Sequence, residues 1–169
     1  MNLEYTQYIP EEFHSSSRVW IYQSSRRFFI SEALSMEPLL EDFVKTWNSH
    51  GAPVKGFANL LFGQFIIIMA DETATGVSGC STDSSVRLIK QMESLYKVNL
   101  FDRQTLAFYA KENIELLPFS QVKYAMENNF LTPETPFFNN LVSTKEELLS
   151  KWIVPIKESW LSRKIKTNA

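Results

Sequence analysis

The chain has 169 residues, of which 44% are hydrophobic and 21% charged, and its net charge is −2. This length predicts one domain over residues 1–169, and the charge excludes a general attraction to nucleic acid or acidic lipid. A single cysteine, no apolar run near the ~20 residues of a membrane helix and no signal-peptide pattern at the start predict a soluble cytoplasmic protein without a membrane partner.

Strand and helix patterns alternate from residue 18 to residue 110. Apolar and β-branched runs predict strands at 18–23, 57–62, 65–71 and 105–110. Helical spacing predicts a first helix from about Glu37 to the stop signal His50-Gly51, and a second from about Asp83 to Lys97. A tight turn at Gly63-Gln64 makes the second and third strands a hairpin, and the uniformly apolar third strand is expected at the centre of the sheet.

The order β-α-β-β-α-β predicts an α+β fold with a ferredoxin-like core at about residues 18–110, built on a four-stranded, mainly antiparallel sheet. Residues 111–169 are expected to form a C-terminal helical extension, with helices near 119–129 and 143–151. Because two helices cover only one face of such a sheet, the many aromatic residues of this extension are expected to cover part of the other face.

A loop of glycines and hydroxyl residues joins the central apolar strand to the second helix. Such a loop before a helix start is a common anion site, because free N–H groups and the helix dipole point outward. At least one of its glycines is expected to have a positive φ. The candidate ligand-binding residues are Gly76, Ser78, Gly79, Cys80, Ser81, Thr82, Ser84 and Ser85. The alternative is a structural loop whose hydroxyls cap the helix.

Thiol chemistry is a second hypothesis for this region. Cys80 near a helix start could be a reactive thiolate and His50 its base, in a pocket walled by Arg18, Arg26 or Arg87. A small buried thiol is the favoured alternative. His14, His50 and Cys80 show no metal-ligand spacing. Asp71, Glu72 and Asp83 could gather round a divalent cation, but acids that border a turn are usually solvated, so no metal or other cofactor is expected.

Two further patterns imitate known motifs. The run 65–72 imitates a Walker B strand, yet the chain has no G-x-x-x-x-G-K-[ST] phosphate loop, which makes ATP hydrolysis of the ABC type an unsupported reading. The runs 19–24 and 55–62 resemble the RNA-binding motifs of RRM domains, but Asn59 replaces a stacking aromatic and the motif falls on the wrong strand. No nucleic-acid partner is therefore expected.

Four blocks of sequence, 19–26, 47–56, 76–86 and 138–145, resemble a family of small uncharacterised bacterial proteins whose members are often labelled "ABC transporter ATPase". The resemblance covers most of the chain from Arg18 to Trp160. It implies family membership without a mechanism, because no activity of that family is established, and no catalytic residue is carried over from it.

Together these patterns favour a non-enzymatic cytoplasmic binding or interaction module, with an anion site in the loop 76–85. The alternative is a small enzyme that acts on a phosphorylated or carboxylated metabolite through Cys80 and His50. A small anion and a protein partner both remain open as ligands, as does a homodimer.

Overall fold

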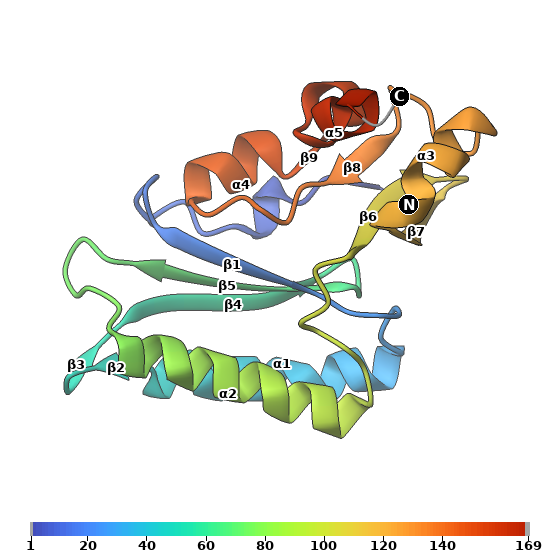
Figure 1. The fold of residues 1–169 in the computed structure, drawn as a ribbon. Coiled ribbons are helices and arrows are strands. Elements are labelled where there is room, and N and C mark those ends of the chain that lie inside the picture. Colours follow the sequence, from blue (N-terminus) through green and yellow to red (C-terminus); the bar gives the residue numbers. More distant parts are fainter. Residues whose placement is uncertain (1, 168–169) are drawn as a thin grey trace.

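A three-stranded antiparallel sheet lies between a layer of two helices and a layer formed by both ends of the chain (Figure 1). This computed structural model describes residues 2–167. The first half of the chain contains η1 (Thr6–Tyr8), β1 (Arg18–Gln23), α1 (Ile30–Thr46), β2 (Asn48–Ser49), β3 (Ala52–Pro53), β4 (Lys55–Leu61), β5 (Phe65–Asp71) and α2 (Gly79–Tyr96). The second half contains β6 (Thr105–Ala110), β7 (Asn113–Pro118), α3 (Phe119–Glu127), β8 (Pro136–Phe138), α4 (Lys145–Lys151), β9 (Ile153–Pro155), η2 (Ile156–Glu158) and α5 (Leu161–Thr167).

The central sheet has the strand order β1–β5–β4, and both pairings are antiparallel. Every residue of β5 is buried, as expected for a strand that is apolar throughout. Its side chains alternate between the two faces of the sheet. Phe65, Ile67 and Met69 pack in one core cluster, whereas Ile66 and Ile68 pack in another.

The two clusters are closed by different parts of the chain. On one face, α1 and α2 contribute Met36, Leu40, Ile89 and Met92 to the core. The other face is covered by residues from both chain ends, namely Tyr5, Ile9, Phe13, Phe138, Val142, Leu148 and Trp152. The expected cover by C-terminal aromatic residues is therefore present, and the N-terminal segment shares in it.

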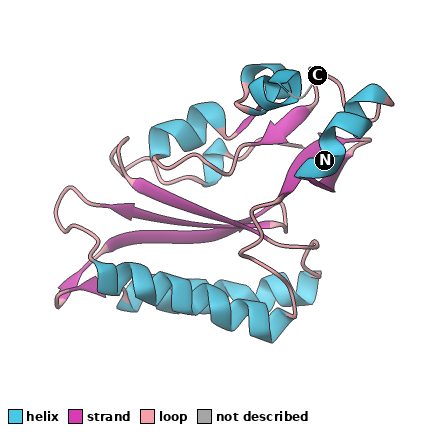
Figure 2. Cartoon of the chain, in the orientation of Figure 1, coloured by secondary structure: helices cyan, strands magenta, loops and turns pink. Residues whose placement is uncertain are grey.

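The expected four-stranded sheet is not present, and this part of the fold prediction is corrected. Strand β6 has the predicted bounds but lies in a second sheet of order β7–β6–β8–β9. Strand β7 was missed, because the turn before it is made by Lys111 and Glu112, both with positive φ, and not by a glycine or asparagine. The C-terminal region thus contains strands as well as helices (Figure 2). The protein is a mixed α+β structure with antiparallel sheets, and a ferredoxin-like arrangement is not confirmed.

The first helix also differs from the prediction. It begins at Ile30, where Glu32 accepts the N–H of Phe29, and it contains Pro38 in its interior. A proline there removes one main-chain hydrogen bond, which an exposed helix face tolerates because water can replace it. His50 and Gly51, predicted as the helix stop, form the turn of the small hairpin β2–β3, with φ values of 52° and 83°. None of the described helices is long and apolar enough to span a membrane.

Candidate functional site

The loop before α2 uses its hydroxyls inside the protein. Ser78 is the N-cap of α2: its Oγ accepts the N–H of Ser81 and lies 2.9 Å from the Ser81 Oγ. Thr82, Ser84 and Ser85 each donate a hydrogen bond to a carbonyl three or four residues earlier in the chain. Ser81 and Ser85 are buried. This pattern is the one expected of a structural capping loop.

Neither glycine of this loop has a positive φ, so that prediction was wrong. A Cβ added at Gly76 or Gly79 would meet no atom within 4 Å. The helix begins at Gly79, four residues before the predicted start, because Ser78 provides the cap. The loop therefore needs neither the conformational freedom nor the close approach that only glycine allows.

The predicted catalytic pair is not assembled. Cys80 is exposed in the first turn of α2, which corrects the preference for a buried thiol. His50 is exposed in the β2–β3 turn, and no hydrogen bond joins it to Cys80 among the described residues. Of the three arginines proposed as a pocket wall, Arg18 pairs with Glu72 at 3.7 Å and Arg26 pairs with Glu32 at 2.8 Å.

The acids bordering the loop have separate partners. The carboxylate of Asp71 accepts hydrogen bonds from the Lys55 Nζ at 2.9 Å, from both the backbone and the hydroxyl of Thr73, and from the backbone of His14. These bonds, led by that of Lys55, hold the pKa of Asp71 well below its usual range. No group of three or more possible metal ligands occurs in the described part of the chain.

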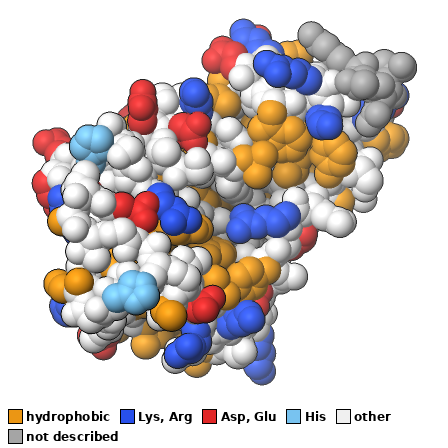
Figure 3. All heavy atoms as spheres, turned by 60° about the vertical axis from the view of Figure 1, so that its left-hand side comes forward, with side chains coloured by type: hydrophobic (Ala, Val, Ile, Leu, Met, Phe, Trp, Pro, Cys, Tyr) orange, Lys and Arg blue, Asp and Glu red, His pale blue; other side chains and the backbone are white. Residues whose placement is uncertain are grey.

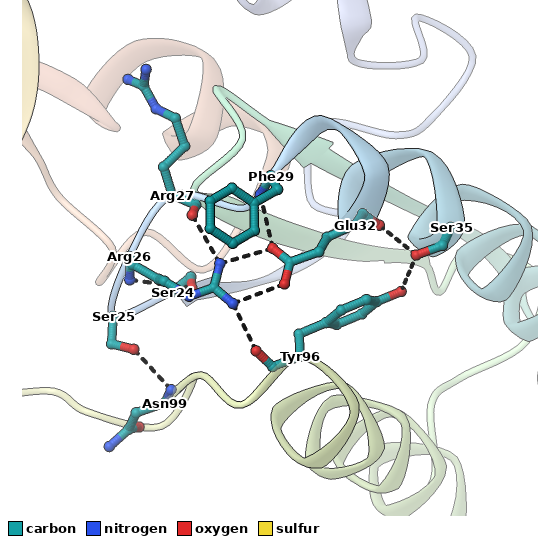
Figure 4. Close-up of polar contacts among 9 residues, drawn as sticks. All are labelled: Ser24, Ser25, Arg26, Arg27, Phe29, Glu32, Ser35, Tyr96 and Asn99. Atoms are coloured by element: carbon teal, nitrogen blue, oxygen red, sulfur yellow. Dashed lines mark hydrogen bonds and ion pairs between the residues drawn. The ribbon is translucent and has the colours of Figure 1, made fainter.

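A second polar network joins the start of α1 to the end of α2 (Figure 4). The guanidinium of Arg26 donates two hydrogen bonds of 2.8 Å to the carboxylate of Glu32 and a third to the carbonyl of Tyr96. The hydroxyls of Tyr96 and Ser35 are 3.0 Å apart. Glu32 thereby lies at a positive helix end and Arg26 at a negative one, which stabilises both dipoles. All these groups have partners, so the network is structural.

The open side of the central sheet is the edge of β4. The strand pairs with β5 on one side, while no other strand pairs with it. Apart from the turn bond of Leu61, no hydrogen bond from outside that ladder reaches the β4 backbone within residues 2–167. Residues 56–60 are half-buried. Every second N–H and C=O group of this strand therefore faces outward without a protein partner.

A groove runs along each face of this edge. The first, of about 450 Å³, lies between β4 and α1 and is lined by Ile30, Ala33, Leu34, Glu37, Leu40, Glu41, Ala58, Asn59 and Leu60. The second, of about 470 Å³, lies between β4 and the N-terminal segment and is lined by Asn2, Glu4, Tyr5, Gln7, Tyr8, Asn59, Leu60, Leu61 and Phe62. Ile30, Leu34 and Tyr8 are each more than half exposed. Edge and grooves together form a continuous surface, called here the β4 edge site.

The opposite edge of the same sheet is occupied by the protein itself. Val19 donates its N–H to the carbonyl of Ser143, and Arg18 forms an isolated β-bridge with Thr144. The Arg103 guanidinium donates to the carbonyl of Ile21. Segments distant in sequence therefore bond to the outward N–H and C=O groups of β1. The corresponding outward groups of β4 have no such partners among residues 2–167.

A smaller cavity of about 210 Å³ lies near β6 and β8, beside Arg103, Leu141 and Trp160. Polar groups of its wall already have hydrogen-bond partners within the protein: Asn140 bonds to Gln23 and Trp152, and the indole N–H of Trp160 bonds to Asn139. On the face drawn in Figure 3, acidic and basic side chains are interspersed around hydrophobic patches. Such a mixed surface offers no extended field of one sign.

Comparisons with protein-family models, with curated proteins and with solved structures gave no match. The candidate site therefore rests on geometry alone. Sequence reasoning missed the β4 edge site, since it depends on which strands remain unpaired. The run 56–62 gave no local signal of an edge, because it carries no charged residue and no proline, which are the residues that usually protect an edge strand.

Proposed function

We propose that this protein is a non-enzymatic interaction module that binds an extended polypeptide segment as an added strand at the β4 edge site. One observation carries the proposal. The seven-residue strand β4 pairs with β5 on one side only, and among residues 2–167 its outer edge has no partner strand and lies between two grooves, while the other edge of the same sheet is covered. Strand addition to an exposed sheet edge is a general mode of peptide recognition, in which main-chain bonds provide affinity and the flanking grooves provide specificity.

Energetic reasoning supports this binding mode. Each main-chain hydrogen bond gained contributes about 0.5–1.5 kcal/mol, and burial of exposed apolar side chains such as Ile30 and Leu34 adds to it. An uncovered edge with no charged residue in the run 56–62 would otherwise favour aggregation. A specific partner strand would remove that liability.

The finer points of the sequence-based reading belong to the same proposal. We infer a cytoplasmic protein of the bacterial family named above. The core is a ferredoxin-like arrangement that lacks its fourth strand, since β1–β5–β4 with two helices on one face reproduces the other elements. Anion binding at Gly76–Ser85 is kept as a secondary hypothesis that the internal hydrogen bonds do not favour.

The proposal is tested by selecting binders from a random peptide display library and mapping their site by amide hydrogen exchange. The wild-type protein should enrich peptides that slow exchange of the β4 amides. N-methylation of alternate peptide nitrogens should remove binding, because it deletes main-chain donors. The variant Ala58→Lys, which places a long side chain in the α1 groove, should not bind the same peptides.

The control is a second variant, Ala74→Lys, in the exposed β5–α2 loop outside both grooves. Peptides should bind this second variant as they bind the wild type. Selected peptides that protect no β4 amide, or that tolerate N-methylation, contradict the proposal.

A further inference from the structure

The charged residues that line the two grooves of the β4 edge site are all acidic. Glu37 and Glu41 line the groove beside α1, and Glu4 lines the groove beside the N-terminal segment. No lysine or arginine lines either groove. Glu41 pairs with Lys45 at 3.2 Å, whereas Glu37 forms no ion pair within the described residues. An incoming strand therefore meets a surface that is apolar and acidic.

The side chains of an added strand alternate between the two grooves, so that residues i and i+2 enter the same groove. They are about 7 Å apart along the strand. In the α1 groove, the apolar residues Ile30 and Leu34 come before Glu37 and Glu41 along the helix. At ~1.5 Å per residue, Leu34 is about 7.5 Å from the midpoint of the two glutamates. The two spacings match.

A second copy of this chain fits this surface less well. A two-fold axis beside β4 would bring Glu37 and Glu41 of both copies toward the same interface, because such an interface is made of the same surface twice. Like charges brought together there oppose association. The charge pattern thus favours a different chain with basic residues.

Resting on the proposed function, we propose that the partner of the β4 edge site is an extended protein segment in which a lysine or arginine lies two positions from an apolar residue. The apolar side chain packs against Leu34, and the cation lies between Glu37 and Glu41. The intervening residue faces the groove of the N-terminal segment, where the exposed side chain of Tyr8 offers aromatic surface.

The test compares two synthetic peptides with capped ends, Thr-Thr-Val-Thr-Lys-Thr-Thr and the same peptide with Glu in place of Lys. Binding is measured by calorimetry at low salt, and the site is mapped by amide hydrogen exchange of β4. The lysine peptide should bind about tenfold more tightly than the glutamate peptide, and added salt should reduce this difference. In the variant Glu37→Gln, the difference in affinity between the two peptides should fall to about threefold. The matched control Glu127→Gln, on the exposed face of α3, should leave it unchanged.

The outcomes separate the two levels of the proposal. Equal binding of both peptides with protection of β4 amides overturns the basic partner and keeps the strand-binding function. If neither peptide protects the β4 amides, the strand-binding function itself falls. If raised protein concentration alone protects them and sedimentation shows a dimer, the occupant is a second copy and the inference is overturned.

Discussion

The two edges of the central sheet differ: other segments of the chain cover the β1 edge, whereas the β4 edge is open within residues 2–167. The β1 edge is covered by the segment around Ser143 and Thr144 and by the side chain of Arg103. Within residues 2–167, no segment covers the β4 edge, and the only charged residue of β4, Lys55, is held by Asp71 and by the carbonyl of Glu12. Folding therefore satisfies one edge internally and leaves the other without a partner strand among residues 2–167.

This difference has a physical origin in where the covering segments come from. Both segments that reach β1 follow α2 in the chain, and they are anchored by the second sheet and by the cluster around Trp152. No segment of residues 2–167 provides an equivalent strand for β4. The closed edge thus owes its cover to tertiary packing by distant segments, whereas the side chains of β4 pack in both core clusters and its outer backbone edge has no such cover.

The largest expected effect comes from breaking the cover of the closed edge with Trp152→Ala. Trp152 is fully buried, packs against Tyr5, Phe65 and Phe138, and donates its indole N–H to Asn140, which in turn bonds Gln23 of β1. Truncation leaves a large cavity and should lower the free energy of unfolding by about 3–5 kcal/mol. Urea denaturation measures this loss.

The matched control for that experiment is Tyr124→Ala, an aromatic truncation on α3 whose side chain is 70% exposed. Its effect should stay within about 0.5 kcal/mol. An equal, small effect of both truncations would mean that the cover of β1 does not depend on the Trp152 cluster.

A smaller loss is expected from Asp71→Asn, which frees Lys55 at the start of the open edge. The buried carboxylate loses its charge-assisted bonds, so we expect a loss of about 1–3 kcal/mol at neutral pH. Because the pKa of Asp71 is lowered in the folded protein, its contribution is present above about pH 4 and is lost as the pH falls further. The difference in the free energy of unfolding between wild type and variant should therefore decrease in acid. Urea titrations at several pH values measure it. A difference that is independent of pH would contradict this account.

Local patterns predicted the elements that depend on local signals. The bounds of β1, β5 and β6 agree with the prediction, because uninterrupted apolar or β-branched runs mark them. The start of α1 was missed because Pro38 resembles a first-turn proline, while the true start depends on Glu32, which bonds to the N–H of Phe29 and to the side chain of Arg26. Strand β7 was missed because two residues other than glycine adopt the positive φ of its turn.

The candidate site was harder to predict than the elements. Hydroxyls around Ser78 suggested a ligand site, yet the same groups serve equally well as helix caps, and only the hydrogen bonds distinguish the two. An open edge is a non-local property. The edge of β4 is exposed because β6 pairs with β7 and β8, and because the segment around Thr144 lies against β1. No pattern within residues 55–61 contains that information.

Removing a single side-chain bond to the covered β1 edge should lower the free energy of unfolding by less than the two changes above. In Arg103→Met, the side chain keeps apolar contact with the Tyr22 ring but loses its hydrogen bond to the carbonyl of Ile21 and its cation–π contact. We expect a loss of about 1 kcal/mol. Arg87→Met, at an exposed position of α2, provides the control and should have almost no effect. If the two variants are equally stable in urea, Arg103 does not contribute to the cover of β1.

The smallest effect on stability is expected on the open edge itself, in Ala58→Lys. Ala58 is half-buried beside the α1 groove, so the lysine stem can lie along Ile30 and Leu34 while its ammonium reaches Glu37 or Glu41. The free energy of unfolding should change by less than about 0.5 kcal/mol. The outward amides of β4 should exchange quickly in both proteins, unlike the amide of Val19, which is bonded to Ser143. A loss of more than about 2 kcal/mol would mean that this groove belongs to the closed core, and the contrast between the two edges would then disappear.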